Sequence, residues 1–310
     1  MAAARTLEQA VATALGNAIA ATASPHQRRL WVDIGTSVRT LTQWDLEQNE
    51  SLVVVGMDAL KSNLDDAQQP QIQRFVRVHG ACTAGPEESA TINVHRSPTC
   101  GSLLRTRTNA PTVGRGKDAC TGDVPTQMAV PAFSLHTLLK LLVPRLARRV
   151  ELLKIDIQGA ELSCLHSAGR ALRHVDNVLL EVQDADEASG ILFYEGSPSI
   201  AALDEALASQ GHERQYCEWN MWMWHVRELN CLYSRASVDP GATELWATGN
   251  WQHDRGSMVS YEPRGYERFQ RFGLVKNLTT STFYGARVTP RFRLRPLWLN
   301  QTLGKRARRP

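Results

Sequence analysis

The stretch VELLKIDIQGAELS, residues 150–163, decides the fold of this chain. An apolar strand leads into a single acidic residue, Asp156, and then into a Gln-Gly-Ala-Glu turn that opens a helix. This order places a carboxylate at the carboxyl end of a buried strand, where open α/β sheets bind their ligands. The stretch therefore predicts one edge of an active site.

Several other apolar runs read as strands that are buried on both faces, because they are continuous rather than alternating. Together with the opening stretch they span residues 30–34, 52–55, 75–78, 150–157 and 178–182, and residues 225–234 read as a closing strand. Helical spacing of apolar residues occurs at residues 40–50, 160–172 and 200–210. This alternation predicts an α/β, doubly wound fold with a mainly parallel sheet.

Two extensions flank the predicted domain, which covers residues 30–237. In the N-terminal extension, residues 1–29, Leu7, Val11, Leu15 and Ile19 recur every fourth residue, which favours an amphipathic helix packed on the domain. The same acid-poor segment also suits a transit peptide, so organellar import stays open. The C-terminal extension, residues 238–310, has no predicted structure and is strongly basic, with 13 Lys/Arg and 3 Asp/Glu in residues 251–310.

The amino-acid composition limits which classes of protein this chain can belong to. A chain of 310 residues with 43% hydrophobic content can bury a sizeable core. The six cysteines form no C-x-x-C pair and have no histidine at metal spacing, so we expect free thiols and no structural metal. No apolar run is long enough for a membrane span, and we expect a cytoplasmic protein.

Residues 97–128 are rich in Gly, Pro, Thr and Arg and interrupt the alternation of strands and helices. We expect a mobile surface loop here, which is either functional or disordered. Because loops around a rigid sheet usually recognise the substrate, we expect the acceptor pocket to come from this loop, the region of Tyr194 and the Trp-rich stretch near residue 222.

The ends of the first two predicted strands carry further acidic residues. Asp33 is followed by Gly35, which allows a sharp turn with backbone N–H groups facing a ligand. The G-x-G-x-x-G pattern is absent, so NAD and FAD are disfavoured. Asp58, after the second strand, is well placed to accept the hydroxyl groups of a ribose. The alternative is that both aspartates only cap the following helices.

The box Leu153-Lys-Ile-Asp-Ile-Gln-Gly-Ala-Glu161 resembles the hallmark of the FkbM-type family of S-adenosylmethionine-dependent methyltransferases, with Gln158 in place of a glutamate and Ile157 in place of a valine. The resemblance covers about residues 30–235. Further landmarks follow in the family's order, namely Asp33 with Gly35, Asp58, residues 79–82, Ser102 with Leu103, and Glu181.

The resemblance implies a Rossmann-like class I methyltransferase fold, in which a mostly parallel seven-stranded sheet has one antiparallel strand. It implies S-adenosylmethionine as the cofactor and O-methylation of a small molecule or sugar. The cofactor-binding residues that it implies are Asp33, Gly35, Thr36, Asp58, Ala81 and Asp156, without a metal. A hydroxyl acceptor must lose its proton, and the candidate bases are Asp156, Glu181 and His79.

The chain also departs from the family pattern. Arg39 stands where the family has a glycine, Ala59 follows Asp58 where the family has a proline, His136 replaces an aspartate, and Gln158 cannot act as a base. These departures motivate an alternative, a methyltransferase-like binding protein that has lost catalysis. The basic C-terminus, with alternating Arg291, Arg293 and Arg295, is compatible with a nucleic-acid partner, although a solvated tail is the favoured interpretation and no nucleic-acid-binding motif accompanies it.

Overall fold

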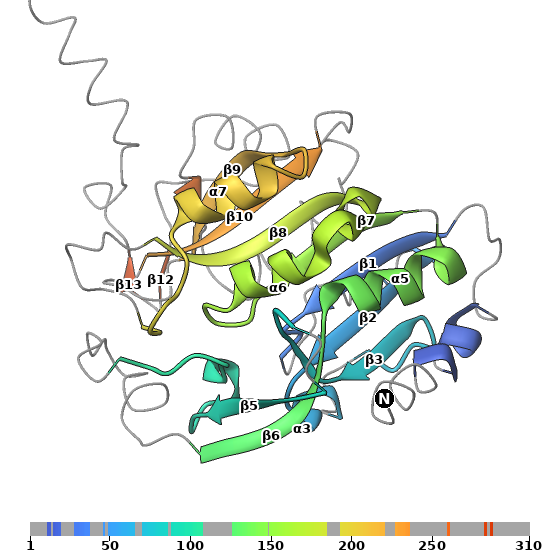
Figure 1. The fold of residues 1–310 in the computed structure, drawn as a ribbon, viewed down its shortest axis with the longest axis horizontal. Helices are drawn as coiled ribbons and strands as arrows, with labels where there is room; N and C mark the ends of the chain where they lie inside the picture. The colour runs from blue at the N-terminus through green and yellow to red at the C-terminus, as the bar shows by residue number, and fades with distance from the viewer. Residues whose placement is uncertain are drawn as a thin grey trace, which may run out of the picture.

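A mostly parallel sheet organises the chain in the computed structural model (Figure 1). The structure describes residues 11–13, 15–19, 28–37, 46, 49–65, 70–85, 88–107, 126–147, 149–184, 193–220, 227–235, 259–260, 282–283 and 286–287. The predicted helix at residues 40–50, Arg39, Trp222 and the arginines at 291–295 therefore lie mainly or wholly outside the described residues.

The central sheet has the order β11-β9-β10-β8-β7-β1-β2-β3. Its parallel strands are β1 (Arg29–Ile34), β2 (Leu52–Asp58), β3 (Phe75–His79), β7 (Val150–Ile155) and β8 (Val175–Asp184). The strand β10 (Arg227–Arg235) runs antiparallel to both β8 and β9 (His212–Asn220), and the two-residue β11 (Val259–Ser260) adds to β9. The seven longer strands confirm the predicted sheet, including its one reversed strand.

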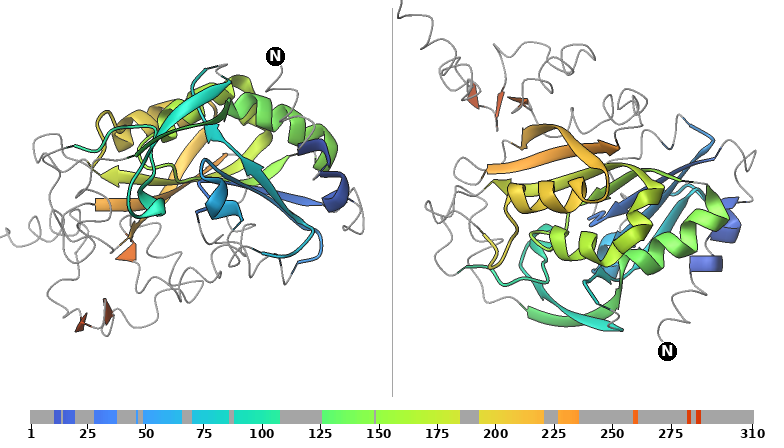
Figure 2. Two further views of the ribbon diagram at one scale, coloured as in Figure 1. Left: turned by 90° about the horizontal axis from the view of Figure 1, so that it is seen from below. Right: turned by 45° about the horizontal axis from the view of Figure 1, so that its top comes forward.

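Helices cover one face of this sheet. Figures 1 and 2 show α5 (Leu135–Leu146), α6 (Glu161–Ala168) and α7 (Ile200–Ala208) side by side on that face, with the 3-10 helix η3 (Gly169–His174) after α6. The short α3 (Lys61–Leu64) follows β2. Ser134 and Ser199 begin α5 and α7 by accepting hydrogen bonds from backbone N–H groups three residues later.

The main hydrophobic core lies between the sheet and these helices. Strand residues such as Val32, Val55 and Leu153 are fully buried in it, as continuous apolar runs predict for a sheet covered on both faces. Val11 and Leu15 of the N-terminal segment, which is helical at residues 11–13 and 15–19, belong to the same cluster. The four-residue spacing of that segment therefore corresponds to a helix face that packs on the core.

A second, three-stranded sheet was not expected from the sequence. It consists of β4 (Ala81–Cys82), β6 (Thr126–Phe133) and β5 (Ser89–Val94), in the order β4-β6-β5, and lies at the lower left in Figure 1, beside the end of β3. The 3-10 helix η1 (Pro98–Cys100) follows β5 and precedes β6, and a further hairpin pairs β12 (Thr282–Phe283) with β13 (Ala286–Arg287). Part of the predicted 97–128 loop is thus ordered.

The expectation of free thiols is wrong, because the described cysteines form disulfides. Cys82 of β4 is bonded to Cys164 of α6, Cys217 of β9 is bonded to Cys231 of β10, and Cys100 is also disulfide-bonded. Cys217 and Cys231 face each other in the register of adjacent antiparallel strands. No local pattern indicates these bonds, since pairing depends on proximity in space and not on spacing along the chain.

Candidate functional site

A buried lysine joins the carboxyl ends of β1 and β7. Lys154 Nζ donates hydrogen bonds to Asp33 Oδ1 and to Asp156 Oδ2, both at 3.1 Å. Burial alone would lower the pKa of Lys154, but the charges of Asp156, Asp33 and Glu181 outweigh it and raise the pKa above its usual range. One ammonium thus stands among three acidic side chains, so this edge of the sheet is negatively charged when they are ionised.

The turn after β1 packs directly on the turn after β7. Gly35 has φ +80°, and a Cβ at this position would lie 1.7 Å from the carbonyl oxygen of Asp156. The N–H groups of Gly35 and Thr36 donate to the carbonyl oxygen of Met57 at 2.8 and 3.1 Å. These N–H groups therefore fasten the turn to β2, whereas the sequence predicted that they would face a ligand.

Asp58 organises the loop that follows β2. Its Oδ2 accepts from the N–H of Ser37 at 2.8 Å, and its Oδ1 accepts from the N–H of Leu60 at 2.7 Å and from Asn63 Nδ2 at 3.1 Å. Burial raises the pKa of Asp58, the hydrogen bonds oppose that rise, and the charge of Asp33 adds to it. The carboxylate thus holds the turns after β1 and β2 together.

The remaining predicted residues fall into two neighbouring groups. His79 lies opposite Asp58 in the pairing of β3 with β2, and its Nε2 lies 3.1 Å from the carbonyl oxygen of Ala59. Ala81 is buried in β4 two residues further on. Glu181 of β8 belongs to the other group, because its charge reaches Lys154. The structure thus gathers one group around Lys154 and the other around Asp58.

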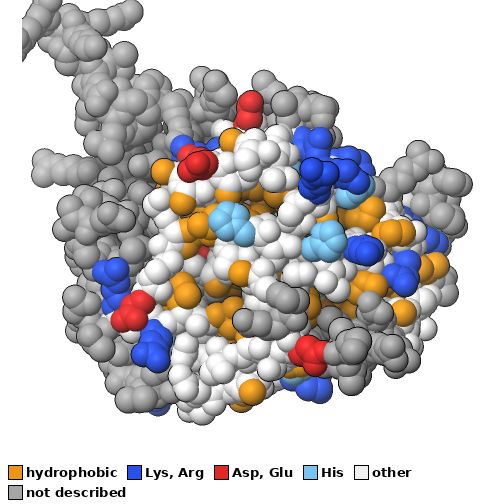
Figure 3. All heavy atoms as spheres, in the orientation of Figure 1, with side chains coloured by type: hydrophobic (Ala, Val, Ile, Leu, Met, Phe, Trp, Pro, Cys, Tyr) orange, Lys and Arg blue, Asp and Glu red, His pale blue; other side chains and the backbone are white. Residues whose placement is uncertain are grey.

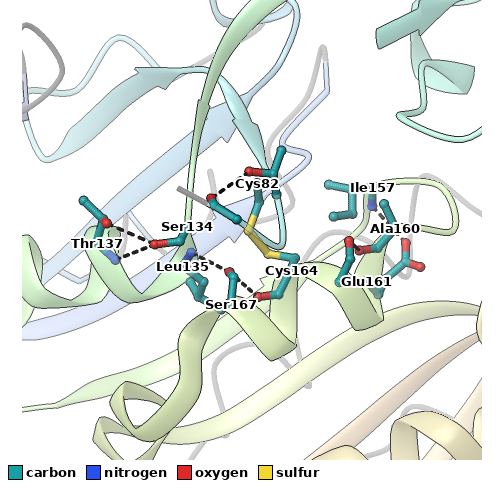
Figure 4. Close-up of a disulfide and its surroundings, with 12 residues drawn as sticks. Cys82, Ser134, Leu135, Thr137, Ile157, Ala160, Glu161, Cys164 and Ser167 are labelled. Atoms are coloured by element: carbon teal, nitrogen blue, oxygen red, sulfur yellow. Dashed lines mark hydrogen bonds between the residues drawn. A yellow bond between two sulfur atoms is a disulfide. The ribbon is translucent and has the colours of Figure 1, made fainter. Parts of the chain in front are cut away.

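Glu161 fixes the turn between β7 and α6 (Figure 4). Its Oε1 accepts hydrogen bonds from the N–H groups of Ile157 and Gly159 at 3.1 and 3.0 Å. Burial raises the pKa of Glu161 to about 8, although these backbone hydrogen bonds act in the opposite direction. In Figure 4, Cys164 follows on the same helix and bonds to Cys82, which ties α6 to the strand beyond β3.

Gln158 connects Asp156 to a residue far along the chain. It has φ +58°, and its Nε2 donates to Asp156 Oδ1 at 3.2 Å. The hydroxyl of Tyr194, which has one hydrogen to donate, lies 3.1 Å from Gln158 Oε1 and also 3.1 Å from the carbonyl oxygen of Cys100. The sequence indicates only that Gln158 is a lost base and does not assign this link.

Lys154 was also missed as a site residue, although it carries a clear signal. A lysine between Leu153 and Ile155 in a buried strand needs charged partners, because an isolated buried ammonium is strongly unfavourable. The acidic residues that end neighbouring strands are the natural partners. The same physical argument links Asp33 to Asp156 through the lysine that lies between them.

Arginines collect at the opposite edge of the sheet. Arg149, Arg173 and Arg235 lie near His174, and burial together with their charges lowers the pKa of that histidine. Figure 3 shows blue side chains gathered at the upper right, near the beginnings of β7 and β8. In the described part of the molecule, charge is therefore distributed unevenly: the arginines lie at one end of the parallel strands and the acidic cluster lies at their carboxyl ends.

Neither a metal site nor a membrane-spanning helix is found in the part of the chain that the structure describes. Within those residues, no group of three or more His, Cys, Asp or Glu side chains could hold a metal ion. No helix among them is long and apolar enough to cross a membrane.

The strand order, the single reversed strand and the acidic residues that end β1, β2 and β7 define a class I methyltransferase fold. Residues 37–218 match the model of the methyltransferase FkbM domain, which is more than half of the chain. The chain belongs to this family of S-adenosylmethionine-dependent methyltransferases. No curated protein matches the sequence significantly.

Solved structures with a detectable similarity include several methyltransferases. The aminoglycoside resistance methyltransferase NpmB1 is 12% identical, with a TM-score of 0.34, and the match covers 72% of this chain and 92% of that chain. The O-methyltransferase NcsB1 from neocarzinostatin biosynthesis is 15% identical, with a TM-score of 0.32, over 70% of this chain and 52% of that chain. LepI in complex with SAM is 13% identical, with a TM-score of 0.34, over 71% of this chain and 46% of that chain. The chain thus spans about half of the length of LepI and of NcsB1.

Proposed function

We propose that this protein transfers a methyl group from S-adenosylmethionine to a hydroxyl group of a small molecule or sugar. The observation that carries the proposal is the cluster of Asp33, Asp156 and Glu181 around Lys154, with Asp58 on the adjoining strand. S-adenosylmethionine supplies a methyl group on a positively charged sulfur. An edge with more carboxylates than cations favours such a ligand electrostatically.

The residues at this edge fit the cofactor in chemical type. Asp58 would accept one ribose hydroxyl, because a carboxylate has about four acceptor directions and three of them are used by the protein. The turn of Asp33, Gly35 and Thr36 would border the methionine end, and the buried Ala81 would lie beside the adenine. Asp156 would lie where cofactor and acceptor meet.

Asp156 is the base that we favour for the acceptor hydroxyl. Lys154 and Gln158 each occupy one of its oxygens and so fix the carboxylate, while its side chain stays 15% exposed. Methyl transfer is an in-line displacement, so most of the rate comes from aligning the reactants, and the base accepts the hydroxyl proton as the oxygen attacks. Glu181 is the second candidate, whereas the contact of His79 with the Ala59 carbonyl favours a role in holding that loop.

Calorimetric titration of the full chain with S-adenosylmethionine tests the cofactor assignment. We expect one-to-one binding that Asp58→Ala weakens about 10-fold or more, because a hydrogen bond to a charged group contributes about 1.5–3 kcal/mol. Asp65→Ala is the matched control, since Asp65 is an exposed aspartate nearby that pairs with Lys61. Absence of heat at high cofactor concentration would refute the proposal and favour the binding-protein alternative.

Transfer of a labelled methyl group to pools of hydroxylated small molecules and sugars tests the reaction. With an acceptor found in this way, we expect Asp156→Asn to reduce the rate about 10²- to 10⁴-fold, which is the usual contribution of a general base. Glu181→Gln should reduce it much less. A larger loss in Glu181→Gln than in Asp156→Asn would transfer the role of base to Glu181.

The disulfides favour an oxidising compartment for the mature protein. Bonds such as Cys82–Cys164 persist in secretory and extracellular environments and are rare where thiols are kept reduced. We therefore propose such a compartment in place of the cytoplasm that the sequence led us to expect. Alkylation of thiols in the protein purified from its native source, followed by peptide mass analysis, would show whether these cysteines are protected.

A further inference from the structure

Two segments that are distant in the sequence pair with each other above the turn after β7. Residues 102–107 and 193–197, which we call the strap, are joined by an antiparallel bridge between Thr106 and Tyr194. The N–H of Arg107 donates to the carbonyl oxygen of Phe193 at 2.7 Å, and the N–H of Glu195 donates to that of Arg105 at 2.8 Å. The strap therefore behaves as a small two-stranded unit.

Side chains of β5 and β8 bind the strap through hydrogen bonds to its backbone. Asn93 of β5 donates through Nδ2 to the carbonyl oxygens of Ser102 and Leu104, at 3.3 and 2.9 Å. Gln183 of β8 accepts the N–H of Phe193 at 3.1 Å. The strap thus connects the three-stranded sheet with the central sheet, across the carboxyl end of β7.

The strap touches the signature turn at Gln158 and Gly159. Ser102 Oγ donates to the Gln158 carbonyl oxygen at 2.7 Å, and the hydroxyl of Tyr194 reaches Gln158 Oε1. A Cβ on Gly159 would lie 2.4 Å from Ser197 Oγ and 3.1 Å from Leu104 Cδ1, and its φ of +97° strains any residue other than glycine, so a substitution here would be strained and would displace Ser197. Close contact and hydrogen bonds therefore seat the strap on this turn.

The amide of Gln158 has the chemistry that this position needs. Asp156, when ionised, can only accept hydrogen bonds, so its partner must donate. The single hydrogen of the Tyr194 hydroxyl is shared between two acceptors at 3.1 Å, Gln158 Oε1 and the carbonyl oxygen of Cys100. An amide satisfies both neighbours at once. A glutamate, which the family carries here, could accept from Tyr194 but would place a second carboxylate beside Asp156.

We propose that Gln158 is a positioning residue that couples the strap to the Asp156 carboxylate, through the chain from the Tyr194 hydroxyl to the Gln158 amide to Asp156. The functional meaning of this chain rests on the proposed function, in which Asp156 receives the acceptor proton, and on the expectation from the sequence that the 97–128 loop and the region of Tyr194 contribute to the acceptor pocket. An acceptor that orders the strap would thereby also orient the base. Other titratable groups around Asp156 are Lys154, Asp33, Glu181 and Glu161.

The dependence of thermal unfolding on pH tests the contact between residues 158 and 156 without cofactor or acceptor. In Gln158→Glu, the new carboxylate must ionise beside Asp156, so we expect its Tm to fall relative to wild type by about 3 °C or more between pH 4 and pH 7. Methionine has a similar volume to glutamine and no charge, so the difference in Tm between Gln158→Met and wild type should not change with pH. Adding Asp156→Asn to Gln158→Glu should remove the pH-dependent part of the loss.

Amide hydrogen exchange tests the coupling to the strap. Gln158→Met should speed exchange of the Arg107 and Glu195 N–H groups about 2- to 10-fold, as expected for the loss of one hydrogen bond. Tyr194→Phe should speed it at least as much, because it also removes the contact with the Cys100 carbonyl oxygen. Tyr233→Phe removes a hydroxyl that bonds to Asp204 elsewhere in the molecule and should leave the strap unchanged.

The inference is overturned if the Tm of Gln158→Glu differs from that of wild type by the same amount at all pH values, or if strap exchange is the same in wild type and in Gln158→Met. Should Gln158→Glu fail to fold, the exchange of Gln158→Met decides alone. Both measurements use the chain without methyl donor. A failure here therefore differs from a failure of the proposed function, which calorimetry with S-adenosylmethionine reports.

Discussion

Removal of the Cys82–Cys164 disulfide by paired alanine substitution should destabilise the protein strongly. The bond joins β4 to α6 across 82 residues of sequence, and both side chains are buried in the main core. A crosslink stabilises a protein mainly because it restricts the unfolded chain, and the effect grows with the loop that it closes. The long separation therefore makes this bond more stabilising than the Cys217–Cys231 bond.

The loop length sets the magnitude. In the chain-entropy relation, a separation of 82 residues corresponds to about 4.5 kcal/mol at 25 °C. The Cys217–Cys231 pair closes 14 residues and corresponds to about 3 kcal/mol. Because native proteins are stable by about 5–15 kcal/mol, the first value is a large fraction of the free energy of unfolding.

Urea unfolding of the oxidised full chain, followed by tryptophan fluorescence, measures the effect. We expect Cys82→Ala/Cys164→Ala to lower the unfolding midpoint more than Cys217→Ala/Cys231→Ala, which serves as the matched control. Alanine is used because serine would bury an extra hydroxyl in the core. The first variant should also bind S-adenosylmethionine more weakly, since α6 follows directly on the Asp156 turn.

Two results would refute this reasoning. An unchanged midpoint for Cys82→Ala/Cys164→Ala would mean that the bond contributes nothing. A larger loss for Cys217→Ala/Cys231→Ala would mean that loop length does not determine the difference. In either case the effect of the disulfides on the free energy of unfolding would not support the proposal of an oxidising compartment.

Three further outcomes follow from the turns and the buried titratable groups. Gly35→Val should lower Tm far more than Gly169→Ala, because position 35 lacks room for a Cβ next to Asp156, whereas Gly169 has φ +49° but no atom within 4 Å of an added Cβ. Burial lowers the pKa of His212 to about 4, whereas the unfolded value is 6.5. The free energy of unfolding should therefore be full above pH 6.5 and fall by about 3 kcal/mol as the pH drops toward 4. His212→Asn should flatten this dependence on pH, as measured by urea unfolding. Burial raises the pKa of Glu161 from 4.5 to about 8. Its contribution to the free energy of unfolding is therefore full below pH 4.5 and is lost as the pH rises through 8. Glu161→Gln should abolish that decline in the same measurement.

Each outcome has a contrary result. Equal losses in Gly35→Val and Gly169→Ala would mean that the turns after β1 and β7 are not in close contact. A wild-type profile that persists in His212→Asn would assign the acid-side loss to another group. A Glu161→Gln variant that keeps the alkaline decline would assign that decline to a group other than Glu161.

The sequence predicted the five parallel strands β1, β2, β3, β7 and β8 well, because they are continuous apolar runs, and it placed the closing strand β10, whereas β9 mixes polar and apolar residues and was not assigned. It did not predict β5 and β6. These strands mix polar and apolar residues, and 31 residues separate Val94 from the start of β6 at Thr126, so no local pattern announces their pairing. Tertiary contacts decide such strands.

At the site, the sequence identified the acidic strand ends but not what joins them. Asp33 and Asp156 were predicted from their positions, whereas Lys154 between them follows only from asking where a buried ammonium finds its partners. The role of Gln158 depends on Tyr194, which is 36 residues away and reaches it through the fold. Hydrogen bonds between residues this far apart in the sequence depend on tertiary geometry, so no sequence spacing predicts them.

The strap also affects how this enzyme can change over evolution. Among the described residues, Phe193 and Tyr194 are buried but belong to none of the three hydrophobic clusters. On the proposal that the strap contributes to the acceptor pocket, substitutions at Phe193 and Tyr194 would alter which acceptor is admitted and leave the three clusters in place, whereas Leu103 packs against the third cluster. New acceptor preferences could arise in this segment while Gly159 is retained, since that glycine is where the strap rests on the turn that carries Asp156.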